Sequence, residues 1–182
     1  MSYFTEREFT LKISATTSLA LSTAILAVAA TSLAAAQTST SNLSVTANIN
    51  NNCAITTTPV AFGVYDPIVG NLTSDLTATG AVLVTCTIGD NTVITLGEGL
   101  NKLGGSTPAV PLRQAANSGN KLNYFLYQDS AHTTAWGNTS PVGVSITGSG
   151  IQQSLPVYGT IVHGQNMPAG SYTDTVVATV TF

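Results

Sequence analysis

The chain has 182 residues, enough for one domain of ordinary size together with a leader or a tail. Charged residues make up only 7% of it and hydrophobic residues 43%, which argues against a disordered chain, because disorder requires high charge and low hydrophobicity. The formal net charge is −3 with only five Lys and Arg residues, so no nucleic-acid partner is expected, since binding to phosphates needs clustered cations.

The N-terminus has the pattern of a secretory signal peptide. Arg7 and Lys12 lie in a polar start, residues 19–33 form an apolar run, and three alanines at 34–36 provide a cleavage site before Gln37. We therefore predict that residues 1–36 are removed on export through the periplasm to the cell surface. The alternative is an uncleaved membrane anchor, because the apolar stretch is almost long enough to span a bilayer.

Both cysteines, Cys53 and Cys86, fall in the exported part of the chain. An even number of cysteines in an oxidising compartment predicts one disulfide. The sequence has no C-x-x-C motif, and its two cysteines and two distant histidines have no metal-ligand spacing, so neither a redox pair nor a metal site is expected. No cofactor is predicted.

The first pattern in the exported part is a strict alternation over residues 43–50. Apolar side chains occupy one face and polar side chains the other; the apolar positions are Leu43, Val45, Ala47 and Ile49. This alternation predicts a half-buried strand but does not say which core buries it.

Further strands are expected along the rest of the chain. In chain order, they cover residues 53–65, 81–88, 93–96, 110–113, 122–127, 133–136, 154–162 and 171–182. Gly89, Asp90 and Asn91 predict a hairpin-like link between the second and third of these strands, and Pro156 indicates an edge or a bulge. No apolar pattern keeps helical spacing for three turns. Many short strands separated by turn residues predict an all-β sandwich.

Several segments occur in an order that resembles a known family. They are residues 52–53, 84–87, 122–127 followed by 131–137, 156–161 and 164–176. Together they are similar to the spore coat protein U domain, whose family includes the pilin subunits of archaic chaperone-usher pili. The resemblance covers about residues 43–182.

This resemblance implies an incomplete immunoglobulin-like β-sandwich that lacks its last strand and is completed by donor-strand exchange. A sandwich without one edge strand leaves an apolar groove and a row of unpaired backbone groups. In the family a periplasmic chaperone fills this groove first, and the N-terminal segment of the next subunit then replaces it. The implied partners are that chaperone, an outer-membrane usher and neighbouring pilus subunits.

The resemblance also implies roles for individual residues. Residues 37–50 become the donor segment, inserting Leu43, Val45, Ala47 and Ile49, and residues 51–182 become the pilin domain. The last strand of that domain would contact the groove and the chaperone through Tyr172, Val176, Ala178, Val180 and Phe182. The alternative for residues 43–50 is an ordinary first strand of their own domain.

The expected function is therefore that of a structural pilus subunit, acting in surface attachment and biofilm formation. An enzyme is not expected: His132 with Asp129, or His163 with Asp174, suggest a hydrolytic triad, but no nucleophile motif accompanies them. The remaining alternatives are a spore or cell coat component and a secreted single-domain adhesin or carbohydrate-binding module. The binding module would use Trp136, Tyr124 and Tyr127 as a platform.

Overall fold

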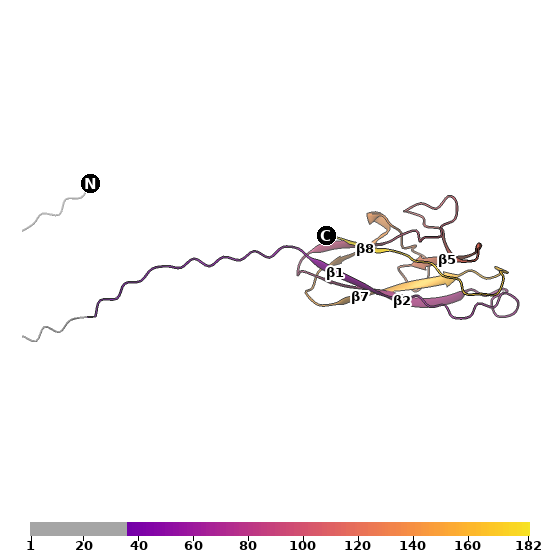
Figure 1. Ribbon diagram of the computed structural model, residues 1–182, viewed down its shortest axis with the longest axis horizontal. Helices are drawn as coiled ribbons and strands as arrows, with labels where there is room; N and C mark the ends of the chain where they lie inside the picture. The colour runs from indigo at the N-terminus through magenta and orange to yellow at the C-terminus, as the bar shows by residue number, and fades with distance from the viewer. Residues whose placement is uncertain (1–35) are drawn as a thin grey trace, which may run out of the picture. The chain divides into compact units, whose positions relative to one another are not determined.

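The computed structural model describes residues 36–182 (Figure 1). The predicted signal peptide, residues 1–36, lies outside this part except for Ala36. Residues 46–182 form one compact unit, and every described strand belongs to it. Among the described residues, no helix is long and apolar enough to cross a bilayer.

The unit consists of two antiparallel sheets. Its elements are β1 (Cys53–Thr58), β2 (Leu76–Cys86), β3 (Asn91–Leu96), β4 (Arg113–Asn117), β5 (Asn120–Tyr127), the 3-10 turn η1 (Ser140–Val142), β6 (Val144–Thr147), β7 (Gln153–Ile161) and β8 (Ala178–Thr181). One sheet has the strand order β1-β2-β7-β5-β4, and the other has the order β6-β3-β8. The all-β class predicted from the sequence is confirmed.

The hairpin predicted between β2 and β3 is wrong, because these strands belong to different sheets. Gly89 has a φ of 82°, and its N–H donates to the Gly148 carbonyl at 2.8 Å. The Gly148 N–H in turn donates to the Asp90 carbonyl at 2.7 Å. These bonds tie the link to the segment that follows β6, so the chain crosses to the opposite layer and does not fold back along β2.

Pro156 lies in a strand that is central, not at an edge, since β7 lies between β2 and β5. The pairing with β5 extends only from Tyr158 to Ile161, whereas Pro156 lies opposite Ala81 of β2. The half of β7 that contains Pro156 therefore has a partner strand on one side only. Proline, which has no N–H, is tolerated there because on the side of β7 without a partner strand no interstrand hydrogen bond is lost.

Several other strand boundaries differ from the prediction. Residues 133–136 contribute only an isolated bridge between Tyr127 and Ala135, and β8 covers only the end of the predicted strand at 171–182. β4 begins where the predicted strand at 110–113 ends, and β6 was not predicted.

The core lies between the two sheets, with Trp136 completely buried in it. The Trp136 Nε1–H donates to the Ile94 carbonyl at 2.9 Å, which satisfies its only polar group. Tyr124 is also buried, with 7% of its surface exposed. The aromatic platform considered from the sequence is therefore wrong, because two of its three members face the core.

A buried cation joins the sheets near Trp136. The Arg113 guanidinium donates to three backbone carbonyls, those of Leu96, Gly97 and Trp136, at 2.7 to 2.9 Å. Burial lowers the pKa of Arg113 to about 10, so the group is still charged at neutral pH. These carbonyls provide the hydrogen bonds that a buried charge requires.

Cys53 and Cys86 lie directly opposite one another in the pairing of β1 with β2 and form a disulfide. The bond closes a loop with a sequence separation of 33. By the chain-entropy model such a loop stabilises the fold by about 3.5 to 4 kcal/mol. We predict that the native chain has no alkylatable thiol and that reduction lowers its free energy of unfolding by about this amount. Intact mass after alkylation counts the free thiols, and urea denaturation with and without reductant measures the change in the free energy of unfolding. Two free thiols in the native chain would contradict the prediction.

Candidate functional site: an open groove into the core

A groove of about 950 Å³ opens into the core between two segments of the chain. We call residues 57–68, which continue from β1, the first rim, and residues 165–178, which lead into β8, the second rim. The floor is made by core side chains of β2, β5 and β7, namely Val82, Leu122, Tyr124, Leu126, Val157 and Ile161. The floor is therefore almost entirely apolar.

The first rim lies directly on the five-stranded sheet because two strand positions there are glycines. A Cβ on Gly80 would come within 2.8 Å of the Val60 side chain, and one on Gly159 within 2.7 Å of Phe62. Phe62 reaches the floor, where its ring meets Tyr124 edge to face at 6.3 Å between centroids. Glycine inside a strand often marks such a close approach of another segment.

The second rim is paired on one side only. Thr173 exchanges both backbone hydrogen bonds with Ala116, and the carbonyls of Thr175 and Val177 accept from Leu100 and Gly97. In an extended chain the backbone groups of adjacent residues point to opposite sides. Those of the intervening residues, Tyr172, Asp174 and Val176, therefore face the groove, and they have no backbone partner among the described residues.

Side chains of the second rim line the groove as well. Tyr172, Val176 and Ala178 are half-buried there, and Val180 packs against the core further along β8. Phe182, predicted to share this face, is more than half exposed and is not among the residues that line the groove.

The Asp174 carboxylate connects the second rim to the floor. One of its oxygens accepts a hydrogen bond from the Tyr124 hydroxyl at 2.7 Å, and the other accepts from the backbone N–H groups of Leu100 and Asn101. Burial, together with the hydrogen bond to Asp174, raises the pKa of Tyr124 well above its usual range, so the hydroxyl keeps its proton. Gly99 has a φ of 84°, and a Cβ there would overlap the carboxylate.

Removing this carboxylate should loosen the rim. We expect Asp174→Ala to lower the free energy of unfolding by about 1 to 3 kcal/mol, because it leaves the buried Tyr124 hydroxyl without an acceptor. Tyr124→Phe is the matched control: it removes the hydroxyl but leaves the bonds from Leu100 and Asn101, so it should cost less. Urea denaturation of both variants measures the difference, and an equal or larger loss for Tyr124→Phe would contradict this role.

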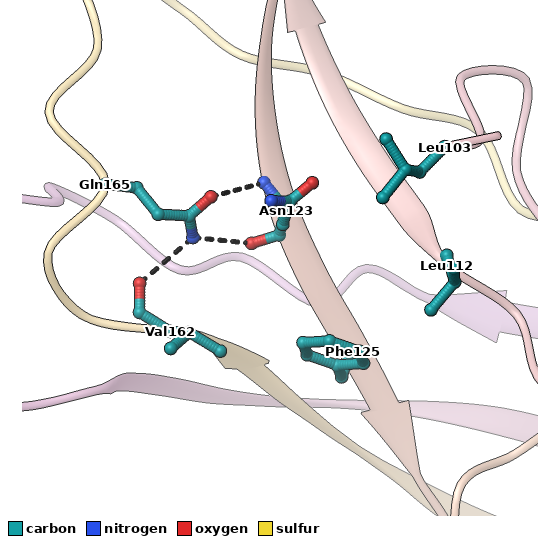
Figure 2. A pocket seen from close by; sticks show the side chains of 6 residues that line it. All are labelled: Leu103, Leu112, Asn123, Phe125, Val162 and Gln165. Carbon is teal, nitrogen blue, oxygen red and sulfur yellow. Dashed lines mark hydrogen bonds between the residues drawn. The ribbon is translucent and has the colours of Figure 1, made fainter. Parts of the chain in front are cut away.

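The two rims are joined at one end of the groove by Gln165 and Tyr65. The Gln165 side-chain amide accepts from the Asn123 N–H at 2.8 Å and donates to the Asn123 and Val162 carbonyls (Figure 2). The Gln165 side chain thus hydrogen-bonds to β5 at Asn123, just beyond Ile161, where β7 ends. The Tyr65 hydroxyl donates to the Val162 carbonyl and accepts from the Gln165 N–H, both at 2.9 Å. Figure 2 also shows Phe125 near Asn123 and Val162, where it lines a small pocket of about 270 Å³.

The predicted donor residues are not part of either sheet. Residues 36–52 form no strand, and Leu43, Val45 and Ile49 are 89%, 84% and 86% exposed. Ala47 is exposed as well. The alternative that residues 43–50 form the first strand of their own domain is therefore wrong, since that strand is β1 and begins at Cys53.

The residues considered for a hydrolytic triad are not brought together. His163 pairs with Asp75 through its Nδ1 at 2.6 Å, whereas Asp174 is engaged by Tyr124. The backbone N–H of His132 donates to the Asp129 carbonyl.

Some residues of the site were not found from the sequence. Val60 and Phe62 of the first rim carry a usable signal, because the strand glycines opposite them, Gly80 and Gly159, indicate a close approach. Gln165 has no such signal, since a surface glutamine and one that pairs with a strand look alike in sequence.

Comparisons with known proteins support the fold and identify the family. A structure of the chaperone–tip adhesion subunit pre-assembly complex (CsuC–CsuE) from the archaic chaperone-usher Csu pili of Acinetobacter baumannii contains a chain of similar fold, with a TM-score of 0.53 and 21% identity. That match covers 74% of the present chain and 40% of the other. Protein U of Myxococcus xanthus is 47% identical over 174 residues, which are 91% of this chain and 97% of that protein. The family model of the Spore Coat Protein U domain matches residues 39–179. The chain belongs to the Spore Coat Protein U domain family, as its sequence motifs predicted.

Proposed function

We propose that this chain is a structural subunit of a chaperone-usher pilus, in which residues 43–49 of one copy fill the groove of the next. The groove is the observation that supports the proposal. It exposes an apolar floor beside a row of unpaired backbone groups, the arrangement that accepts an added strand. In this account the groove is the place of a missing last strand of an immunoglobulin-like sandwich.

The donor segment matches the groove in chemistry. Its apolar face would lie on the apolar floor, while Ser44, Thr46 and Asn48 would face outward. Each buried Val, Leu or Ile side chain would stabilise the assembly by on the order of 1.5 to 3 kcal/mol. Backbone bonds to Tyr172, Asp174 and Val176 would add to this and fix the register.

The same groove explains why a chaperone and an usher are the expected partners. An unfilled groove is an exposed apolar surface beside an open strand edge, which favours aggregation. A periplasmic chaperone would cover it until the usher brings the next subunit. The signal pattern of residues 1–36 and the disulfide support export through an oxidising periplasm to the cell surface, where the pilus would act in attachment.

The proposal is tested by blocking assembly with the donor segment itself. We expect the exported chain to form fibres visible by negative-stain electron microscopy, and an excess of a peptide of residues 37–50 to stop their growth. A peptide with Val45→Asp and Ile49→Asp is the matched control and should have no effect. Fibres that grow equally with either peptide, or a chain that stays monomeric, would contradict strand donation.

A coat component is the second candidate, because the matching family model is named for a spore coat protein and the similarity to Protein U covers almost the whole length of that relative. Such a coat would use the same strand donation but form a layer over the cell or spore. Immunogold labelling of intact cells distinguishes the two, since a pilus gives label on projecting fibres and a coat gives label spread over the surface.

A further inference from the structure

The two ends of the domain expose aliphatic side chains outside the core. Figure 1 shows the start of β1 and the C-terminus at one end, which we call the root end and define by residues 50–53, 87–90 and 148–151. The far end carries residues 63–72 and 163–170, which are joined by the bond from the Gly164 N–H to the Asn71 carbonyl.

The far end exposes its aliphatic side chains to solvent on a loop that is held by internal hydrogen bonds. The Asp66 carboxylate accepts from the N–H groups of Ile68 and Val69 at 3.0 and 3.2 Å, and Asn71 bonds back to Asp66 through both backbone and side chain. Val64, Ile68 and Val69 are 87%, 62% and 79% exposed. Val64 and Ile68 also line the end of the groove, so this surface is continuous with it.

The root end carries a smaller aliphatic surface made by Ile88 and Ile151, which are 78% and 70% exposed. Ile88 lies against the backbone beside Ile151, because a Cβ on Gly150 would come within 2.9 Å of it. The Gly150 N–H donates to the Cys86 carbonyl at 3.0 Å, which anchors this loop to β2.

The segment that precedes β1 is fastened to the same end. Asn52 and Thr87 are joined by three hydrogen bonds of 3.0 to 3.3 Å. The Asn51 side chain donates at 2.8 Å to the carboxylate of Asp90, which is buried. The chain therefore leaves its domain from a fixed point beside Ile88.

The length of this segment limits how far apart two neighbouring copies can be. Four residue steps separate Ile49 from Cys53, so their Cα atoms are at most about 14 Å apart. β1 runs from the root end to the far end, and β8 runs the other way, since the C-terminus that follows it lies at the root end (Figure 1). A strand inserted antiparallel to β8 would thus finish at the far end of the acceptor, with the donor's root end beside it.

We propose, resting on the strand donation proposed above, that neighbouring copies also meet end to end. Val64, Ile68 and Val69 of the acceptor contact Ile88 and Ile151 of the copy whose strand fills its groove. Because the contact joins two different surfaces, each copy can make it with the copy before and the copy after it along a fibre. Five aliphatic side chains are too few to join free subunits. A strand tether raises their effective concentration to the millimolar range, which makes the contact effective within a fibre. The contact stiffens the fibre and is not needed for its assembly.

The first test measures fibre stiffness. Val69→Asp and Ile88→Asp should each leave assembly and the melting temperature unchanged and lower the persistence length several-fold in electron micrographs, since Val69 lies at the far end but does not line the groove. Val69→Asp combined with Ile88→Lys in one chain should restore stiffness, because the two positions meet between copies. Val110→Asp is the matched control, since Val110 is 61% exposed on a loop outside both ends.

The second test measures proximity. A chain with Val69→Cys and Ile88→Cys should give a ladder of covalent oligomers when its fibres are treated with a short bis-maleimide, whereas Val110→Cys with Ile88→Cys should not. Unchanged stiffness and no ladder beyond the control would overturn the end-to-end contact and leave strand donation intact. Fibres that keep their stiffness but lose binding to polystyrene beads would make the far end an adhesive surface and overturn the contact as well. An unaltered chain that forms no fibre would instead overturn the proposed function.

Discussion

Replacing Val45 or Ile49 with Asp should abolish the polymer, whereas Asp at Ser44 or Thr46 should be tolerated. The side chains of Val45 and Ile49 are exposed in the unassembled chain, so a charge there costs the fold little. In a neighbour's groove the same charge would lie on an apolar floor, where it loses the burial of an aliphatic side chain and is desolvated without a partner. If the two effects together cost more than about 4 kcal/mol of binding free energy, the affinity of the donor segment for the groove falls roughly a thousandfold.

Sedimentation of the exported chain and its four variants measures this effect. Ser44 and Thr46 are suitable controls, because successive side chains of a strand point to opposite faces. A polymer that forms normally with Val45→Asp would remove residues 43–49 as the donor. Loss of the polymer with all four variants alike would show that added charge, and not register, is responsible.

The second large effect is stabilisation of an empty groove by a donor peptide. The Val45→Asp chain serves as the acceptor, because its own segment cannot insert and its groove remains open. A peptide of residues 37–50 at about one hundred times its dissociation constant should stabilise this chain by about 2.7 kcal/mol. For a domain of about 150 residues this raises the melting temperature by roughly 10 °C.

Differential scanning fluorimetry across a peptide titration measures the shift. The control peptide with Ser44→Asp keeps the apolar face and should give a similar rise, while one with Val45→Asp should give none. A melting temperature that does not change with any peptide concentration would mean that the groove does not bind this segment.

The strands that form the five-stranded sheet could largely be predicted from the sequence. β2, β5 and β7 have alternating or β-branched and aromatic runs bounded by turn residues, and these local properties determine where a strand forms. Pairing partners were harder to predict. Residues 89–91 have the composition of a hairpin turn, but bonds to Gly148, more than fifty residues away, direct the chain into the other sheet.

The second rim shows why the end of the chain was predicted as one long strand. Its side chains alternate over residues 171–180 between exposed and half-buried, as in a strand, so the pattern was correct about the faces. Only Ala178–Thr181 form a strand, because the rest of this segment has backbone bonds on one side alone, at Thr173, Thr175 and Val177, and its other side faces the groove. Alternation of apolar and polar residues indicates which side chains are buried. It does not indicate whether the backbone is hydrogen-bonded to a neighbouring strand.

The candidate site was accessible from the sequence only in part. Tyr172, Val176 and Ala178 were placed on a groove-facing strand, and they line the groove. The link between Tyr65 and Gln165 depends on a contact between residues one hundred positions apart, which a single sequence does not display.

Hydrogen exchange followed by mass spectrometry tests most directly whether residues 43–49 of one copy fill the groove of another. In the Val45→Asp chain, which we expect not to assemble, the amides of residues 43–49 and those of Asp174 and Val176 should exchange rapidly, since they have no backbone partner within residues 36–182. In fibres of the unaltered chain both sets should become strongly protected together, because each forms ladder bonds with the other. Fibres in which residues 43–49 still exchange as fast as in the unassembled chain would contradict strand donation by this segment.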